Sequence, residues 1–263
     1  MELGSVLGTL LGILAVVGGQ LLEGGSLGQL IQPAAACIVG LGTLAAVLVS
    51  FPLDDLQRAW VRIPRIYSGV GSSSGELIVE IIEVAHLARK EGILAIEARR
   101  SALRDPVLRR TLKYVVDGFE PAAVREILDA EIGLVLDAEE RAAQVFETAG
   151  GYAPTVGIIG AVLGLIHVMA KLNEPERIGE GIAVAFVATI YGVALANLIL
   201  LPWGSRLKAL AQAEVLGKEL VKSGVIGILE GANPFILQEK LEILAGKHDA
   251  PVESAPAAAG GAA

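Results

Sequence analysis

Four long apolar segments constrain this chain more than any other feature of its sequence. They cover residues 3–22, 28–51, 152–172 and 182–203, and no Asp, Glu, Lys or Arg lies in the central part of any of them. About 20 helical residues cross the roughly 30 Å hydrocarbon core of a bilayer, so each segment is long enough to span it. A charge at the bilayer centre would cost a few kcal/mol. The sequence therefore predicts an all-α integral membrane protein with four transmembrane helices.

The composition agrees with this interpretation and excludes other classes of protein. Hydrophobic residues make up 53% of the chain and the mean hydropathy is +0.61, values that water-soluble cores rarely reach. The net charge of −8 argues against a nucleic-acid partner, which requires an excess of Lys and Arg. The one cysteine, Cys37, excludes an intramolecular disulfide and any site with several Cys ligands.

The positions of the basic residues predict the orientation in the membrane. Of the 21 Lys and Arg residues, thirteen lie in 51–150 and six in 203–263, and short cytoplasmic loops retain such residues. We therefore expect a multi-pass protein with both termini and the long middle segment in the cytoplasm. The predicted segments are transmembrane helices one and two (1–51), a large helical cytoplasmic domain (52–151), transmembrane helices three and four (152–203), cytoplasmic C-terminal helices (204–248) and a disordered tail (249–263).

Capping and periodicity predict helices throughout the cytoplasmic parts. A capping box, Ser73-x-x-Glu76, precedes apolar residues at helical spacing up to a break at Gly92. A second helix is expected from Ile93 to Asp105-Pro106, and a long one from Pro121. The apolar residues at helical spacing after the capping box are Leu77, Ile81, Val84, Leu87 and Ala88, and a third run includes Leu108, Leu112 and Val115. After the fourth span a helix continues over 207–228, and Asn233-Pro234 opens a short one that ends near Gly246.

No pattern of a common enzyme or metal site occurs in the chain. The P-loop, zinc-protease and nucleophile-elbow motifs are absent, which predicts no enzyme, no cofactor and no metal site. His86 and His248 lie in polar sequence, where a solvated imidazole is expected. His167 lies near the outer end of the third span and suits either a proton path or an interface anchor.

Small residues repeat along one face of three spans, which favours close helix packing. The repeats are Gly4, Gly8 and Gly12; Gly160 and Gly164; and Ala188, Gly192 and Ala196. The polar groups inside the spans are hydroxyls and amides, and no span contains a carboxylate to hold a proton part-way. Either the chain conducts nothing or a partner supplies the acid. If a partner supplies the carboxylate, the residues suited to surround it are Thr155, beside Pro154, and Thr189, near Tyr191. The alternative for each Thr is that its hydroxyl only hydrogen-bonds a backbone carbonyl of its own helix.

Three segments together resemble the MotA family of flagellar stator subunits, within the MotA/TolQ/ExbB proton channel superfamily. They are 91–97 (EGILAIE), 150–160 (GGYAPTVGIIG) and 181–192 (GIAVAFVATIYG). The likeness covers nearly the whole chain, and its four spans with a large loop after the second separate it from ExbB and TolQ, which have three.

The resemblance implies an assembly and a function. It implies a pentameric ring around a dimer of a MotB-type, single-span, peptidoglycan-binding subunit, whose membrane helix carries the ion-binding aspartate. It also implies a place in the bacterial inner membrane. Ion passage would turn the ring and convert proton motive force into torque on the rotor's switch ring, which drives motility and chemotaxis.

The resemblance also implies roles for individual residues. Arg89 and Glu97 match the family's charged pair for rotor contact, with Glu131 as a third candidate. Sodium-driven members have Thr at the position of Ala161, which favours H⁺ over Na⁺ as the transported ion. Pro154 and Pro202 match the two prolines that flank the channel helices of the family, and Thr189 matches its channel-facing Thr. Together with Thr155 and Tyr191 from the residue pattern above, the expected ion-path residues are Pro154, Thr155, Ala161, Thr189, Tyr191 and Pro202.

Two other classes of function compete with this reading. A solute transporter would need inverted repeats or a charge at the bilayer midplane, and the sequence has neither. A purely structural membrane scaffold, or a stator-like ion-driven subunit that powers a non-flagellar process, fits the packing motifs equally well.

Overall fold

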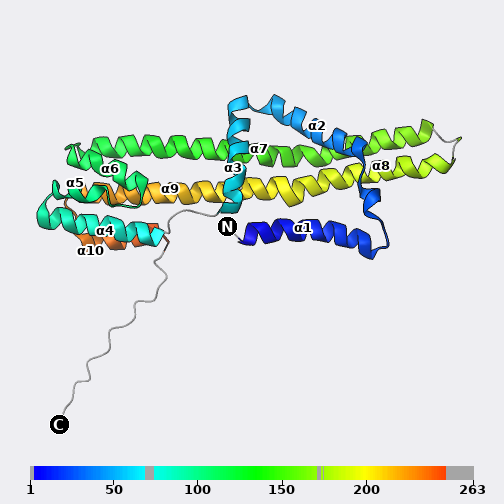
Figure 1. The fold of residues 1–263 in the computed structure, drawn as a ribbon. Helices are drawn as coiled ribbons and strands as arrows, with labels where there is room; N and C mark the ends of the chain where they lie inside the picture. The colour runs from blue at the N-terminus through cyan, green and yellow to red at the C-terminus, as the bar shows by residue number, and fades with distance from the viewer. Residues whose placement is uncertain (1–2, 69–73, 171–172, 174, 247–263) are drawn as a thin grey trace, which may run out of the picture. The chain divides into compact units, whose positions relative to one another are not determined.

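The computed structural model describes residues 3–68, 74–170, 173 and 175–246, and every regular element among them is a helix (Figure 1). Four stretches are long and apolar enough to cross a membrane: Leu3–Leu22, Leu27–Ser50, Pro121–Ala170 and Gly181–Leu229. The all-helical fold is thus as predicted. In chain order the elements are α1 (Leu3–Leu22), the 3₁₀ turn η1 (Leu27–Leu30), α2 (Pro33–Ser50), α3 (Leu53–Ser68), α4 (Ser74–Glu91), α5 (Ala95–Arg100), α6 (Pro106–Val116), α7 (Pro121–Ala170), α8 (Pro175–Ala194), the π-helical turn η2 (Leu195–Leu200), α9 (Leu201–Leu229) and α10 (Pro234–Leu244).

The helices form two compact units, and each unit is built from two separate parts of the chain. The first unit contains residues 1–70 and 133–213, and the second contains 71–132 and 214–263. This division differs from the predicted segments, which followed the expected membrane boundaries. In the first unit α3 packs against α7 through Ala59, Ile66 and Phe146, and the ring of Phe146 meets that of Trp203 edge to face at 5.6 Å.

The second apolar segment begins its α-helix later than predicted. We expected a helix from Gly28, but α2 starts at Pro33, after the short turn η1 and an extended Gln32 with φ −123° and ψ 95°. Proline has no N–H to donate and favours the first helical position, and it disfavours helical backbone in the residue before it. A proline at this position therefore sets the boundary.

The predicted cytoplasmic helix from Pro121 and the third span form one helix, α7, of 50 residues. Gly150 continues this helix and brings α9 close to it. A Cβ atom added to Gly150 would lie 2.7 Å from the Leu201 side chain. The fourth span likewise continues into α9 through the π-helical turn η2. This turn ends two residues before Pro202, which cannot donate a backbone hydrogen bond and whose ring crowds the carbonyl four residues earlier, inside the turn.

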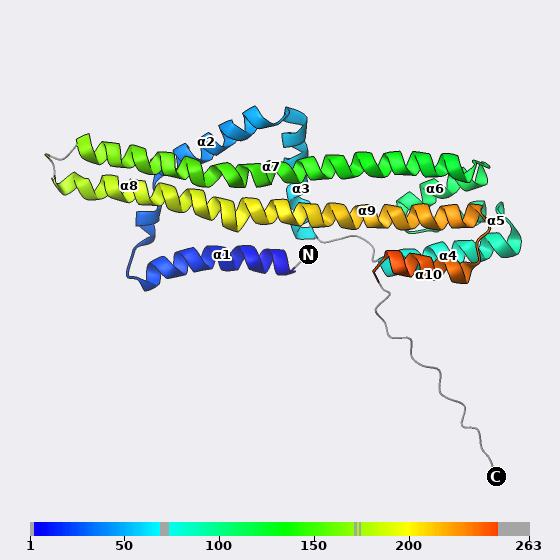
Figure 2. The same ribbon diagram turned by 180° about the vertical axis from the view of Figure 1, so that it is seen from behind.

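The second unit contains an apolar core that includes residues recurring at helical spacing in the sequence. Figures 1 and 2 show α4 and α10 side by side, with α7 beside α9. Leu108, Leu112, Ile81 and Val115 are at most 1% exposed, and they pack with Leu220 and Leu241. Gly92 ends α4 with a φ of +93°, and the side chain of Asn233 accepts a hydrogen bond from Phe235 N–H at the start of α10. The break at Gly92 and the α10 cap are confirmed.

The helix expected from Ile93 to Asp105 is wrong in length, because α5 ends at Arg100. The Glu80 carboxylate accepts hydrogen bonds from the backbone N–H groups of Arg104 at 2.9 Å and Asp105 at 3.3 Å. Asp105 in turn accepts a hydrogen bond from Leu108 N–H at 2.7 Å and caps α6. These bonds hold the connection in a turn and compete with a longer helix. Ser73 of the predicted capping box, His248 and the predicted tail lie outside the described residues.

Candidate functional site

Glycine and alanine bring α7 and α8 into backbone contact within the first unit. A Cβ atom added to Gly192 would lie 2.5 Å from the carbonyl oxygen of Ala153, and one added to Gly157 would lie 2.9 Å from that of Ala188. Gly164 is similarly close to Ala185. The repeats predicted in the third and fourth spans therefore face each other. The repeat in the first span makes no such contact at Gly4 or Gly8, because a Cβ atom added to either residue would meet nothing within 4 Å.

One side of this helix pair is covered by α2. A Cβ atom added to Gly42 of α2 would lie 2.6 Å from the Val156 side chain of α7. One added to Gly160 of α7 would lie 3.5 Å from the Ile38 side chain of α2. Tyr191 of α8 also faces this side, and its hydroxyl donates a hydrogen bond to the carbonyl oxygen of Leu30. The structure therefore turns Tyr191 toward the α1–α2 connection and not toward the same side as Thr189.

Three of the predicted ion-path residues share the side of α7 and α8 that α2 leaves open. Pro154 and Ala161 are seven residues apart, which is about two helical turns, so they lie on one face of α7, and both are partly exposed. A Cβ atom on Gly157, between them, would lie 3.5 Å from the Cα atom of Thr189. The open side of the pair thus carries Pro154, Ala161 and Thr189.

The other predicted ion-path residues lie elsewhere. Thr155 is exposed, and its six-residue separation from Ala161 rotates it by about 120° around α7. Pro202 is exposed on α9, next to Leu201, which contacts Gly150 one turn from Pro154. The two prolines therefore lie at a similar level of the bundle.

The hydroxyls of both threonines bond their own helices. Thr155 donates to the Tyr152 carbonyl at 2.8 Å, and Thr189 donates to the Ala185 carbonyl at 3.4 Å. The second bond is long, so the Thr189 hydroxyl loses little by exchanging it for another partner.

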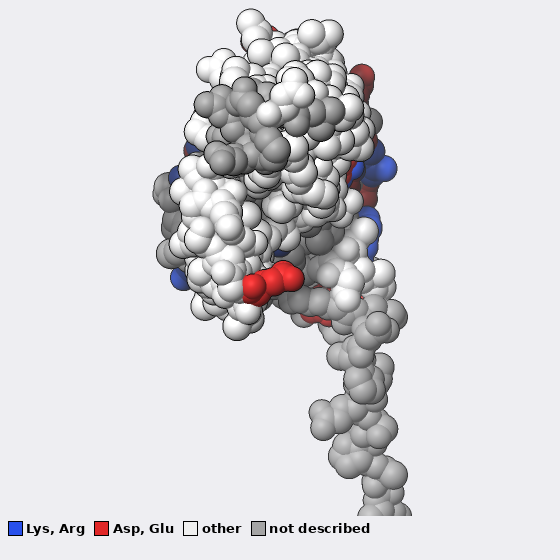
Figure 3. All heavy atoms as spheres, turned by 90° about the vertical axis from the view of Figure 1, so that its right-hand side faces the viewer, with Lys and Arg blue, Asp and Glu red and all other residues white. Residues whose placement is uncertain are grey.

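No Asp, Glu, Lys or Arg lies in the central part of any apolar span. Figure 3 views the molecule from the end where α7 and α8 meet, and the described residues that face the viewer are mostly uncharged, with an acidic group below them. His167 is exposed on α7, so both readings of it stay open. Within the described residues, no three His, Cys, Asp or Glu side chains lie close enough to hold a metal ion.

The predicted rotor-contact residues lie in two different environments of the second unit. Arg89 is exposed in the last turn of α4, with no ion pair to any described residue. Glu97 on α5 is 49% exposed at its side chain and accepts a hydrogen bond from Arg100 at 2.7 Å. Gly92 lies between them, so the structure presents both charges to solvent on separate helices.

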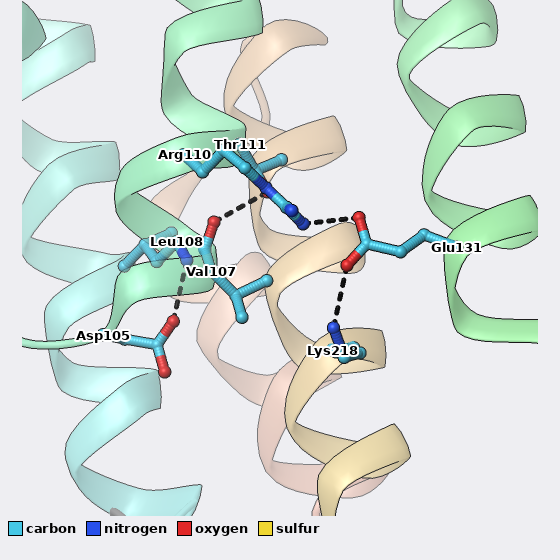
Figure 4. A network of polar contacts seen from close by, with 7 residues as sticks. All are labelled: Asp105, Val107, Leu108, Arg110, Thr111, Glu131 and Lys218. Carbon is cyan, nitrogen blue, oxygen red and sulfur yellow. Dashed lines mark hydrogen bonds and ion pairs between the residues drawn. The ribbon is translucent and has the colours of Figure 1, made fainter. Parts of the chain in front are cut away.

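Glu131 instead belongs to a network that joins three helices (Figure 4). Its carboxylate on α7 accepts hydrogen bonds from Arg110 of α6 and from Lys218 of α9, the latter at 2.8 Å. Arg110, and then Lys218, hold the pKa of the Glu131 carboxyl below its usual value, against the opposing effect of burial. This geometry is that of a structural ion pair.

The buried carboxylate of Glu139 was not predicted from the sequence. Glu139 of α7 is 6% exposed and accepts a hydrogen bond from Arg62 of α3, with Arg65 at 3.8 Å. The charges on α3 and its apolar face were visible as a helical pattern, but nothing in the sequence indicates a partner 77 residues away. The pairs join α3 to α7 in the first unit.

Comparison with known proteins gives consistent results. Residues 99–219 match the MotA/TolQ/ExbB proton channel family. The chain is 33% identical to Motility protein A of Bacillus subtilis (92% of this chain and 90% of that protein), and 29% identical to Chemotaxis protein PomA of Vibrio alginolyticus (92% and 94%).

Two solved structures are also similar. MotAB of C. jejuni matches with a TM-score of 0.89 and 30% identity over 95% of this chain and 98% of that one. The flagellar MotAB stator complex of Bacillus subtilis matches with a TM-score of 0.83 and 33% identity, over 90% and 93%.

Proposed function

The chain belongs to the MotA/TolQ/ExbB proton channel family, and its 33% identity to Motility protein A over 92% of its length makes it a flagellar motor stator subunit. We propose how its residues couple ion flow to torque. The similarity to two MotAB structures extends over 95% and 90% of the chain. The subunit therefore forms a channel and is not an enzyme. Its four apolar helices belong in the bacterial inner membrane.

The observation that carries the mechanism is the missing acid. The four apolar segments contain no Asp or Glu in their central parts, yet a proton needs a titratable group part-way across the bilayer. The MotB-type partner supplies this carboxylate from its own membrane helix. The chain then provides the helix surface beside which this carboxylate binds and releases the proton.

The ion path follows the open side of α7 and α8, at Pro154, Ala161 and Thr189. Small side chains on this side let a partner helix approach closely. The long hydrogen bond from Thr189 to Ala185 leaves its hydroxyl available to a proton carrier or water. The transported ion is H⁺, because the methyl group of Ala161 offers no oxygen ligand for Na⁺.

The subunit acts as a ring of five copies around a partner dimer. Each copy exposes large apolar residues on α7 and α8, including Ile158, Val162 and Phe186 at 50% or more, which need lipid or another helix as cover. The excess of Lys and Arg in 51–150 and 203–263 supports a cytoplasmic location for both termini and for the second unit.

The rotor contact is made by Arg89 and Glu97 and reaches the switch ring through their exposed charges. Glu131 serves this contact indirectly, since its bonds to Arg110 and Lys218 hold α6 and α9 against α7. A rigid second unit transmits the rotation of the ring to the rotor contact.

Proton flux into reconstituted vesicles tests the division of labour between chain and partner. Vesicles that contain this chain alone should acidify no faster than protein-free vesicles, and vesicles with the partner should acidify faster. A partner whose membrane aspartate is replaced by Asn is the matched control and should remove the difference. Robust flux through the chain alone would contradict the proposal.

A further inference from the structure

The Tyr191 hydroxyl connects α8 to the α1–α2 connection, about 160 residues away in the sequence. It donates a hydrogen bond to the Leu30 carbonyl oxygen and accepts one from the Gln32 backbone N–H at 3.3 Å. The ring is partly buried and packs against Ala35, Val187 and Ala188. One hydroxyl therefore serves both a backbone acceptor and a backbone donor.

Those two backbone groups flank an interruption in helical hydrogen bonding. Ile31 and Gln32 are extended between η1 and α2, and no side chain of the connection caps the start of α2. At or near the hydrocarbon region, unsatisfied N–H and C=O groups are costly, and interrupted backbone is tolerated only where other groups satisfy it. Tyr191 provides that satisfaction from a different helix.

The small residues between α7 and α8 give close contact but little directional constraint. Glycine and alanine present nearly smooth surfaces, whereas a hydrogen bond fixes both a distance and an angle. Thr189 lies two residues before Tyr191, about 200° around the helix, and so faces the opposite side of α8. The regular helix ends three residues after Tyr191, where the π-helical turn η2 begins.

We propose that Tyr191 is a positioning residue that fixes the rotation of α8 about its axis and thereby holds Thr189 toward the ion path. A turn of α8 that broke the bonds to Leu30 and Gln32 would swing Thr189 away from the open side. The inference rests on the proposed role of that side, but the orientation of position 189 can be measured independently.

The first test compares Tyr191→Phe with Tyr152→Phe in the complete stator complex. Tyr152 is the matched control, because its hydroxyl lies at an exposed site, 3.3 Å from the Ser50 hydroxyl. In a single-motor assay, the number of speed steps reports how many complexes assemble, and the height of each step reports the output of one complex. Tyr191→Phe should assemble but give steps at least about twofold lower, while Tyr152→Phe should match the parent.

The second test measures orientation without reference to torque. Cys37→Ser removes the only cysteine, and Thr189→Cys then places a single thiol on the open side. Addition of Tyr191→Phe should change the rate at which a membrane-permeant thiol reagent labels position 189 by about threefold to tenfold. This range is the population shift expected when one hydrogen bond is lost. Tyr152→Phe should leave the labelling rate unchanged.

Each outcome decides the question. Unchanged step height and labelling would overturn the inference, and so would a complete loss of assembly, since the contact would then be a requirement for folding and not for positioning. A change in labelling, combined with full step height in Thr189→Val, would keep the rotational role of Tyr191 and reject Thr189 as part of the ion path.

Discussion

The helix α7 contributes to both units, but its two ends pack against their neighbours in different ways. In the first unit it meets α8 through glycine and alanine, as at Gly157 and Ala188. In the second unit it meets α9 through large aliphatic side chains, Val124 and Leu128 among them. Ion pairs are added there, with Lys222 2.6 Å from Asp129.

The difference follows from the solvent that each unit needs. Lipid tails are as apolar as Leu, so burying a large side chain between membrane helices gains little, and close backbone contact must provide the attraction. In water the same burial contributes roughly 25 cal/mol per Å², and charged residues at the edge of the core stay solvated or paired. One continuous helix can therefore use both kinds of packing.

The largest expected effect is on the small-residue contact. Gly192→Leu would push a side chain into the Ala153 carbonyl and should cost about 3 kcal/mol or more, which prevents stable assembly. Complex yield after detergent extraction, together with swimming, measures this loss. Gly40→Leu is the control, because a Cβ atom there meets nothing within 4 Å. Normal yield from Gly192→Leu would show that this contact tolerates bulk.

A cavity in the aliphatic core of the second unit should have the next largest effect. Leu112→Ala removes a side chain that is 0% exposed and should destabilise the second unit by about 2–5 kcal/mol. Limited proteolysis of the intact protein over a temperature series would detect the loss. Leu94→Ala, at a residue 79% exposed, is the control and should behave like the parent. Equal sensitivity in the two variants would contradict the burial argument.

The ion pair at Glu131 should have a smaller effect that depends on pH. Its pKa is lowered in the folded protein, so its contribution to stability is complete above the unfolded value and is lost as pH falls through the folded value, below about pH 4.5. Glu131→Gln should lower stability by about 1 kcal/mol at pH 7 and by less in acid. Thermal aggregation of parent and variant at pH 7 and pH 4 measures the difference.

A surface pair between α7 and the residue that follows α9 provides the control for that prediction. Glu230 lies 3.7 Å from Arg125, and both side chains are more than half exposed. Glu230→Gln should therefore change nothing at either pH. A constant gap between Glu131→Gln and the parent across this range would contradict the role of the Glu131 charge.

Charge reversal at the rotor contact should have the smallest effect on folding and a large effect on function. Arg89→Glu and Glu97→Lys change exposed charges and should alter stability by less than about 1 kcal/mol. They should nevertheless lower swimming, because reversed charges repel a charged rotor face, and a matching reversal on the rotor should partly restore it. Lys240→Glu on α10 is the charge-reversal control. Normal swimming in both variants at parental expression would remove these residues from the rotor contact.

Several features of the site were predictable because they depend on residues close together in sequence. The run of apolar residues predicted each span, and Gly92 predicted the end of α4. The facing repeats around Gly160 and Gly192 were also predictable, although their partners were not. The missing acid is a property of composition alone, and it pointed to a partner.

The sequence by itself determined which segments are long and apolar enough to cross a membrane, and several helix ends such as those at Gly92 and Asn233. Lipid and helix caps act on neighbouring residues, and periodicity records that directly. Only the tertiary structure decided that Tyr191 faces α2 while Thr189 faces the open side, that Glu139 pairs with α3, and that Glu131 is held by two cations. These contacts join groups distant in the chain, so their energies depend on how the helices rotate and pack against one another.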